Sequence, residues 1–165
     1  MKFLIEDNIK FMQQFSIYHT SNELFLKAIL RLIEKCYYSN FKSVILTTDV
    51  HQQEMLNKNL WTYSRKQFIP HGSKFDPQPA KQPIYITDEL QNPNNASVLV
   101  IISPTDIAKI LQVKEYIKVF KRIIIITDLL ENLKELIIKI NKFTGQENKI
   151  DCFTQNPIGT WNKIA

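Results

Sequence analysis

The chain has 165 residues, of which 44% are hydrophobic and 22% charged, with a formal net charge of +5. This length predicts one domain with a substantial core, and the composition excludes an intrinsically disordered chain. The apolar runs VLVII (98–102) and IIII (123–126) fall well short of a membrane span, and no export signal opens the sequence, so we expect a cytoplasmic protein. The excess of basic residues alone does not show whether the protein binds nucleic acid, an acidic peptide or a membrane surface.

The residues that most often carry metal or nucleophilic chemistry are few and scattered. Cys36 and Cys152 have no cysteine or histidine neighbours at metal-ligand spacing, which predicts two reduced thiols and neither a zinc site nor a disulfide. His19, His51 and His71 stand at unrelated places, without a serine or cysteine context that would make a nucleophile. We therefore assign no catalytic histidine, no metal and no cofactor.

Hydrophobic periodicity predicts strands and helices that alternate along the chain. In chain order, the predicted elements are a strand at 14–20, a helix with apolar positions from Leu24 to Cys36, a strand at 42–49, a helix at 49–61, a loop at 71–83, strands at 84–88 and 97–103, a helix from Pro104 to about Phe120, a strand at 122–128, a helix at 130–143 and a short tail. Such alternation, with near-continuous β-branched runs, predicts a single-domain, three-layer, Rossmann-like α/β fold. Its sheet should be mostly parallel, with helices on both faces.

Two of the predicted helices begin with capping-box sequences. In the first, Thr20 stands three residues before Glu23, and in the second, Asp49 stands three residues before Gln52. In a capping box the first side chain accepts a hydrogen bond from the helix backbone while the second reaches back. The sequence thus predicts that Thr20 and Asp49 each cap a helix.

A nucleotide site in such a sheet needs a glycine-rich turn between a strand and a helix, so that the backbone can approach a phosphate. The chain has only Gly72, Gly145 and Gly159, and none of them follows a predicted strand and opens a helix. Dinucleotide-binding and P-loop functions are therefore not expected.

Three predicted strands end alike, in TTD, ITD and ITD, which places Asp49, Asp88 and Asp128 at strand carboxyl ends. Ligands of open α/β sheets bind at that edge, and clustered aspartates there would hold Mg²⁺ for a phosphohydrolase or nuclease. Strand-to-helix turns also favour aspartate as a cap, without any catalytic role. We favour capping and keep the metal-dependent enzyme as the alternative.

The segment LWTYSRKQFIPHG (60–72) is aromatic and closed by proline, yet its apolar residues fit neither a helical stripe nor a strand alternation. Something must cover such a segment. One hypothesis is direct binding of single-stranded nucleic acid, in which Trp61 and Tyr63 stack on bases and Arg65 and Lys66 contact phosphates.

The predicted helix at 130–143 has an unusual polar side. Its core stripe consists of Leu133, Leu136, Ile137 and Ile140, and its opposite side of Lys134, Ile138, Lys139, Asn141 and Lys142. An isoleucine among lysines is consistent with a solvated face that carries one stray apolar residue. It is equally what a shallow, basic-rimmed pocket for an acidic peptide with an apolar end requires.

The paired motifs Leu60-Trp61 and Phe68-Ile69-Pro70-His71 resemble the Leu-Trp, Phe-Val/Ile-Pro-His signature of the chi subunit of bacterial DNA polymerase III. The order of the predicted elements is also similar to that family. The resemblance implies an α/β adaptor of the clamp-loader assembly without catalysis of its own. In that family chi joins the psi subunit on one side and the acidic, apolar-ended C-terminal tail of the single-stranded-DNA-binding protein on the other.

The resemblance runs from about Phe15 to Trp161. It leaves residues 1–13 as an N-terminal extension outside the family pattern, and residues 14–165 as one chi-like α/β domain.

The resemblance also implies two binding sites. Trp61, Phe68 and Pro70 fall where the family contacts psi, and a large aromatic side chain beside a rigid proline is typical of an interface hot spot. The alternative is an aromatic loop packed on its own domain.

For the tail site, Lys142 matches a basic position of the family's last helix. Asn141 stands where an aromatic residue is familiar, and Ile138 where an arginine is. Lys134 and Lys139 would restore the lost charge, and Ile138 would replace the lost apolar contact.

Overall fold

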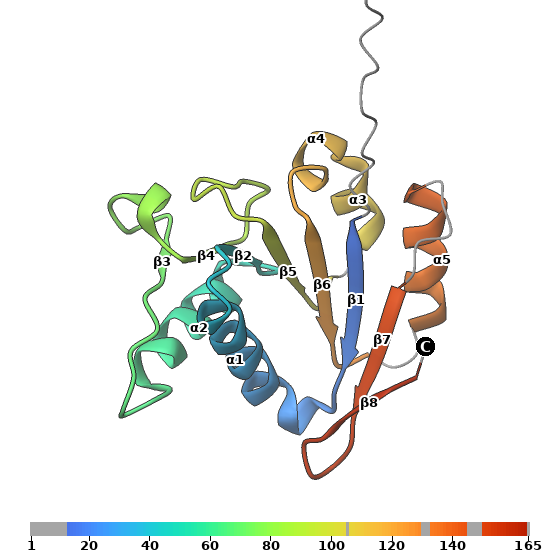
Figure 1. Ribbon diagram of the computed structural model, residues 1–165, viewed down its shortest axis with the longest axis horizontal. Helices are drawn as coiled ribbons and strands as arrows, with labels where there is room; N and C mark the ends of the chain where they lie inside the picture. Colours follow the sequence, from blue (N-terminus) through green and yellow to red (C-terminus); the bar gives the residue numbers. More distant parts are fainter. Residues whose placement is uncertain (1–12, 105, 130–132, 145–149, 165) are drawn as a thin grey trace, which may run out of the picture.

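A computed structural model describes residues 13–104, 106–129, 133–144 and 150–164, which form one sheet with helices on both faces (Figure 1). The elements are β1 (Gln14–His19), α1 (Asn22–Tyr38), β2 (Ser43–Leu46), α2 (Val50–Thr62), β3 (Gly72–Ser73), the 3₁₀ helix η1 (Pro79–Lys81), β4 (Ile84–Thr87), β5 (Val98–Ile102), α3 (Ile107–Gln112), α4 (Lys114–Ile117), β6 (Arg122–Thr127), α5 (Leu133–Thr144), β7 (Ile150–Gln155) and β8 (Trp161–Lys163). The predicted three-layer α/β class is confirmed. Among the described residues, no helix is long and apolar enough to cross a membrane.

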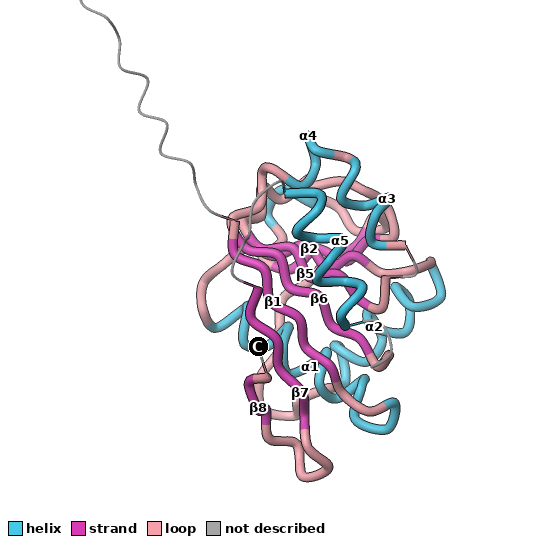
Figure 2. The backbone as a smooth tube through the Cα atoms, turned by 90° about the vertical axis from the view of Figure 1, so that its right-hand side faces the viewer, coloured by secondary structure: helices cyan, strands magenta, loops and turns pink. Residues whose placement is uncertain are grey.

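The sheet has the strand order β3-β4-β2-β5-β6-β1-β7-β8. All neighbouring strands are parallel except β8, which runs antiparallel to β7. In the middle of the sheet, Ile17 of β1 is in register with Ile125 of β6 on one side and Cys152 of β7 on the other. The tube in Figure 2 shows β6, β1 and β7 running side by side, with α5 on the near side of the sheet and α1 on the far side. The predicted, mostly parallel sheet is therefore confirmed.

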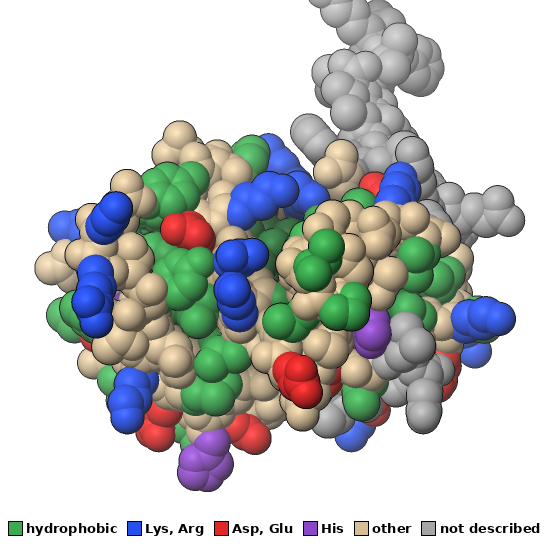
Figure 3. Space-filling view, turned by 90° about the horizontal axis from the view of Figure 1, so that it is seen from below, with side chains coloured by type: hydrophobic (Ala, Val, Ile, Leu, Met, Phe, Trp, Pro, Cys, Tyr) green, Lys and Arg blue, Asp and Glu red, His purple; other side chains and the backbone are tan. Residues whose placement is uncertain are grey.

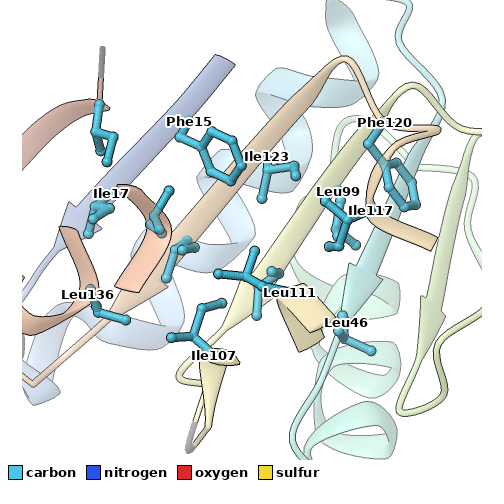
Figure 4. Packing of buried hydrophobic residues seen from close by; sticks show 14 of the residues in the cluster. Phe15, Ile17, Leu46, Leu99, Ile107, Leu111, Ile117, Phe120, Ile123 and Leu136 are labelled. Carbon is cyan, nitrogen blue, oxygen red and sulfur yellow. The ribbon is translucent and has the colours of Figure 1, made fainter. Parts of the chain in front are cut away.

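Alternate residues of the central strands point to opposite faces, which divides the core into two clusters. On one face, Leu99 and Ile101 of β5 pack with α3, α4 and α5 (Figure 4). On the other face, Val98, Val100 and Ile102 of the same strand pack with α1 and α2. Because both faces are covered, the central strands read as continuous apolar runs rather than as an alternation.

One of the two predicted helix caps forms, although Gln52 reaches back to the backbone N–H of Thr48 rather than to that of Asp49. Asp49 is the N-cap of α2, where its Oδ1 accepts a hydrogen bond from the backbone N–H of Gln52 at 2.8 Å. The other prediction is wrong, because Ser21 occupies the N-cap position of α1 and its side chain makes no capping bond. The hydroxyl of Thr20 instead donates to Oε1 of Gln155 at 2.7 Å, so a tertiary bond to β7 replaces the local cap.

The single helix predicted from Pro104 to about Phe120 is also wrong, because the chain forms two short helices there. The first begins after Asp106, whose side chain accepts from the N–H of Lys109. Val113 then leaves helical geometry with ψ of 73°. This break allows Ile117 and Phe120 to enter the core that α3 also contacts.

The sequence pattern missed four elements. The segment 71–83, predicted to be a loop, contains β3 and η1, and the predicted tail contains β7 and β8. β7 carries an irregular pattern, in which only Ile150 and Cys152 are buried, because it lies near the edge of the sheet. A strand that is only partly covered lacks the long apolar run that identified the central strands.

Candidate functional site

Two exposed aromatic side chains form a pair at the end of α2. Trp61 is 60% exposed and Phe68 is 50% exposed, although the two ring centroids lie only 4.8 Å apart. Each ring covers part of the other and leaves its remaining surface to solvent. A cluster of large exposed aromatics is unusual on an isolated protein and is typical of a surface that binds a partner.

The surrounding chain explains why these side chains point outward. Leu60, next to Trp61 in α2, is 2% exposed and packs in the core, so the helix presents Trp61 on its outer side. Ile69 likewise packs in the core and holds the loop between Phe68 and Pro70 against the domain. The half-buried Pro70 lies beside this anchor. The structure thus brings Trp61 and Phe68 together, with Pro70 close in the chain.

Two side-chain hydrogen bonds tie the loop after α2 to α1. The hydroxyl of Tyr63 donates to Oε2 of Glu34 at 3.1 Å, and the hydroxyl of Tyr38 donates to Oε1 of Gln67. Burial, followed by the Glu34 carboxylate, raises the pKa of the Tyr63 phenol. Because Tyr63 is engaged with α1, the predicted stacking pair of Trp61 and Tyr63 does not form a common platform for bases.

His71 supports the aromatic pair from below. Its ring centroid lies 5.5 Å from that of Trp61 and 5.9 Å from that of Phe68, and the residue is buried. Its Nδ1 lies 2.7 Å from the carbonyl oxygen of Ile69 and must therefore be the protonated nitrogen that donates. Sequence reasoning placed His71 in the signature but not in the surface. The signal was its position directly after Pro70.

The three strand-end aspartates have separate local roles. Asp49 caps α2, Asp88 lies 3.4 Å from Nζ of Lys74, and Asp128 accepts from the Ser103 hydroxyl at 3.5 Å. β2 and β4 are neighbours, but β5 separates β2 from β6, which precedes Asp128. Across the described ranges, no three His, Cys, Asp or Glu side chains gather closely enough to hold a metal ion.

A buried threonine stands one or two positions before each of these aspartates and bonds to the backbone of the turn that follows the strand. The hydroxyl of Thr47 donates to the carbonyl of Asp49 at 3.1 Å. The hydroxyl of Thr87 accepts from the N–H of Glu89 at 3.0 Å, and that of Thr127 accepts from the N–H of Leu129 at 3.1 Å. All three threonines are buried. A buried threonine hydroxyl therefore supports a local turn at each of these strand ends.

The face of α5 carries the second predicted site. Ile138 is 64% exposed, and Lys134 and Lys142, one turn before and after it, are exposed as well. At about 100° per residue these three side chains form one row along the helix, with Asn141 beside it. The structure therefore brings together an apolar side chain and two lysines.

Lys139 lies at the side of this row and is engaged. Its Nζ lies 2.7 Å from Oε1 of Glu135, four residues earlier, and the hydrogen bond from this carboxylate raises the pKa of Lys139. Exposed pairs of this spacing are weak but reduce the net positive charge of the face. The sequence held the signal for this pair, because Glu135 and Lys139 stand at the favourable i, i+4 spacing.

Neither site lies over a single basic stripe. On the face drawn in Figure 3, basic side chains stand in separate groups among exposed hydrophobic ones. The aromatic pair lies at the end of α2, on the face covered by α1 and α2, and the lysine row lies on α5, on the opposite face of the sheet (Figures 1 and 2).

The fold defines a doubly wound α/β protein whose strand-to-helix turns lack a glycine-rich phosphate loop. Trp61, Phe68 and Ile138 present exposed apolar side chains on α2, the loop after α2 and α5. A family model described as DNA polymerase III chi subunit, HolC, matches residues 12–136. The chain belongs to this family, and its role is in DNA replication as part of the DNA polymerase III complex. The matched residues include the whole aromatic surface and the first turn of α5.

Proposed function

We propose that this protein is a non-catalytic adaptor of the replicative polymerase. It links the clamp loader, through the psi subunit, to the C-terminal tail of the single-stranded-DNA-binding protein. The observation that carries the proposal is the exposed pair of Trp61 and Phe68 in a chain of the chi family. This role implies a cytoplasmic protein.

The aromatic surface, defined as Trp61, Phe68 and Pro70, is proposed to bind psi. Trp61 keeps most of its surface free while its neighbours Leu60 and Ile69 are anchored in the core. Such a side chain is presented on a rigid support, which reduces the entropy that is lost on binding. Its ring contacts with Phe68 and His71 limit its motion further.

The lysine row, defined as Lys134, Ile138 and Lys142, is proposed to bind the tail, with Asn141 and Lys139 at its sides. The apolar end of the tail would contact Ile138, and its acidic residues would face Lys134 and Lys142. Among the described residues no carboxylate pairs with either of these two lysines. Only Lys134 lies within the family match, so this site depends more on the charge and exposure of α5 than on the family.

Because the aromatic surface and the lysine row belong to opposite faces of the sheet, one chain would hold both partners at once. The test is capture from a lysate of the source organism on the wild-type protein, Trp61→Ala and Lys142→Glu, with identification by mass spectrometry. We expect Trp61→Ala to lose psi and keep the single-stranded-DNA-binding protein, and Lys142→Glu to do the reverse. Loss of both partners in both variants, or of neither, would contradict the assignment.

A further inference from the structure

A cavity on the α1 face of the sheet is lined by none of the residues that define the two proposed surfaces. It has a volume of about 480 Å³ and is bounded by the C-terminal half of α1, the first residues of β1, β5 and β6, and the turn before β6. A smaller cavity of about 140 Å³ adjoins it and shares Tyr18, Leu32 and Lys35 with it. Together they form a groove along α1, which we call the α1 groove. The larger cavity is in the range that binds compact ligands or side chains of a partner.

The floor of the α1 groove is apolar. It is formed by Leu32, Cys36, Val98 and Ile124. One wall is aromatic, since Tyr18 stacks on Phe153 with centroids 4.9 Å apart and meets the edge of Trp161 at 5.1 Å. This packing fixes the wall in place. The floor offers van der Waals contact to an apolar side chain.

The rim of the α1 groove is basic. Among the described residues, five cationic side chains and no aspartate or glutamate line the two cavities: Arg31, Lys35, Lys118, Lys121 and Arg122. Lys118 is paired with Glu115 at 2.5 Å. In the described part of the chain, no carboxylate forms an ion pair with Lys35 or Arg122.

From this arrangement we propose that the α1 groove is a docking site for an acidic peptide segment of another protein. A bulky apolar side chain of the segment would fill the cavity between α1 and β1, and flanking carboxylates would meet Lys35 and Arg122. Charge complementarity and the aliphatic floor select this occupant. Single-stranded nucleic acid requires a series of free aromatic faces, whereas one face of Tyr18 is already covered by Phe153.

This site is separate from the proposed tail site. The α1 groove lies on the face that α1 and α2 cover, and the lysine row lies on α5, which covers the other face. Occupation of one does not block the other, so the two proposals succeed or fail independently.

The test uses a fluorescein-labelled peptide in which one phenylalanine stands between two pairs of aspartates, with both ends blocked. Fluorescence anisotropy follows its binding to the full chain. We expect Lys35→Glu combined with Arg122→Glu to weaken binding about tenfold or more at low salt, with a smaller effect at high salt. Lys27→Glu is the matched control, because Lys27 is exposed on the same helix but does not line the groove. It should change affinity less than about twofold.

The apolar contact is tested separately. Replacing the peptide's phenylalanine by serine should weaken binding about tenfold, and Leu32→Ala should weaken it about fivefold, both with little salt dependence. Cys36 lines the cavity, so a bound peptide should also slow alkylation of its thiol. Because burial raises the pKa of this thiol, the alkylation is carried out at mildly alkaline pH. Cys152 is the internal control, since it is buried in the opposite core cluster.

Several results would overturn the α1 groove proposal. Equal binding of the phenylalanine and serine peptides would remove the role of the cavity. Loss of binding in Lys142→Glu, with none in the Lys35→Glu and Arg122→Glu double variant, would assign the peptide to α5. Displacement of the peptide by oligothymidylate would identify single-stranded nucleic acid as the occupant of the groove. Peptide binding seen only in a chain that lacks residues 1–12 would identify that segment of the chain itself as the occupant.

Discussion

Replacing Trp61 by alanine should separate partner binding from folding, because most of this side chain is exposed in the free protein. A tryptophan side chain offers roughly 150–250 Å² of surface for burial. With 60% of Trp61 exposed, roughly 90–150 Å² remains for a partner to cover. At about 25 cal/mol per Å², covering this area contributes about 2–4 kcal/mol to association. This range is that of an interface hot spot.

The covered part of Trp61 sets the cost to the fold. Applied to the covered part of the side chain, the same calculation gives a loss of at most about 1.5–2.5 kcal/mol of folding stability in Trp61→Ala. Burial that persists in a compact unfolded state reduces this loss further. Leu60 is the matched control, because it precedes Trp61 in α2 and is 2% exposed. Leu60→Ala should cost about 2–5 kcal/mol of folding stability through the cavity that it leaves.

The measurement pairs chemical denaturation with isothermal titration of psi against the wild type, Trp61→Ala and Leu60→Ala. We expect Trp61→Ala to lower the affinity for psi by about 2–4 kcal/mol while its folding midpoint stays above that of Leu60→Ala. If Trp61→Ala unfolds as readily as Leu60→Ala, or binds psi like the wild type, then Trp61 belongs to the core and the aromatic surface is not the psi site.

Three further predictions concern the tail, the aspartates and the alkaline range. In titrations with a synthetic tail peptide, Lys142→Ala should cost about 1 kcal/mol of binding free energy and lose its effect as salt rises. Ile138→Ala should cost about 1–2 kcal/mol of binding free energy at any salt. A peptide without its terminal apolar residue should bind the wild type and Ile138→Ala equally. Asp49→Ala should lower folding stability by about 1 kcal/mol by removing the cap of α2, Asp49→Asn should be nearly neutral, and neither the wild type nor the variants should show Mg²⁺- or Mn²⁺-dependent nuclease or phosphatase turnover. Burial raises the pKa of the Tyr116 phenol, so the unfolded chain ionises first and stability falls as pH rises above the ordinary value of 10.0. Because the Tyr116 hydroxyl has no hydrogen-bond partner among the described residues, Tyr116→Phe should unfold less readily at alkaline pH and gain up to about 1 kcal/mol near neutral pH, by thermal denaturation.

The central strands could be predicted because burial on both faces leaves a direct mark on the sequence. VLVII and IIII became β5 and β6, the two strands that divide the core between the helix layers. The edge strands left no such mark, since β7 buries only Ile150 and Cys152 and β8 buries none of its residues. A pattern of burial identifies a strand only to the extent that neighbouring elements cover it.

Where a local sequence signal predicted the wrong structure, a tertiary contact is the reason. Thr20 and Asp49 both stand at the start of capping-box sequences, yet only Asp49 caps its helix, because β7 supplies Gln155 as a partner for Thr20. Val113 is neither glycine nor proline, and still the helix predicted across it breaks so that Ile117 reaches the core. In neither case do the neighbouring residues in the sequence indicate the tertiary contact that decides the local structure.

The aromatic surface was indicated by residue type, but its exposure was not. Trp61 and Phe68 are seven positions apart and follow no period, so their ring contact depends on the path of the loop that Ile69 anchors. The α1 groove could not be predicted at all. Its lining comes from α1, from several strands and from the segments that connect them, which lie far apart in the sequence.

The strand ends distinguish this sheet from nucleotide-binding sheets of similar architecture. In such sheets the ligand normally binds beyond the carboxyl ends of the strands, where backbone N–H groups are free to meet a phosphate. In this chain the buried hydroxyls of Thr47, Thr87 and Thr127 bind the backbone of the turns that follow, and Asp49 takes up an N–H at the start of α2. Backbone groups that a nucleotide would use are thus engaged by the chain itself. The exposed side chains of Trp61, Phe68 and Ile138 lie instead on α2, the loop after α2 and α5, which the doubly covered sheet holds on opposite faces.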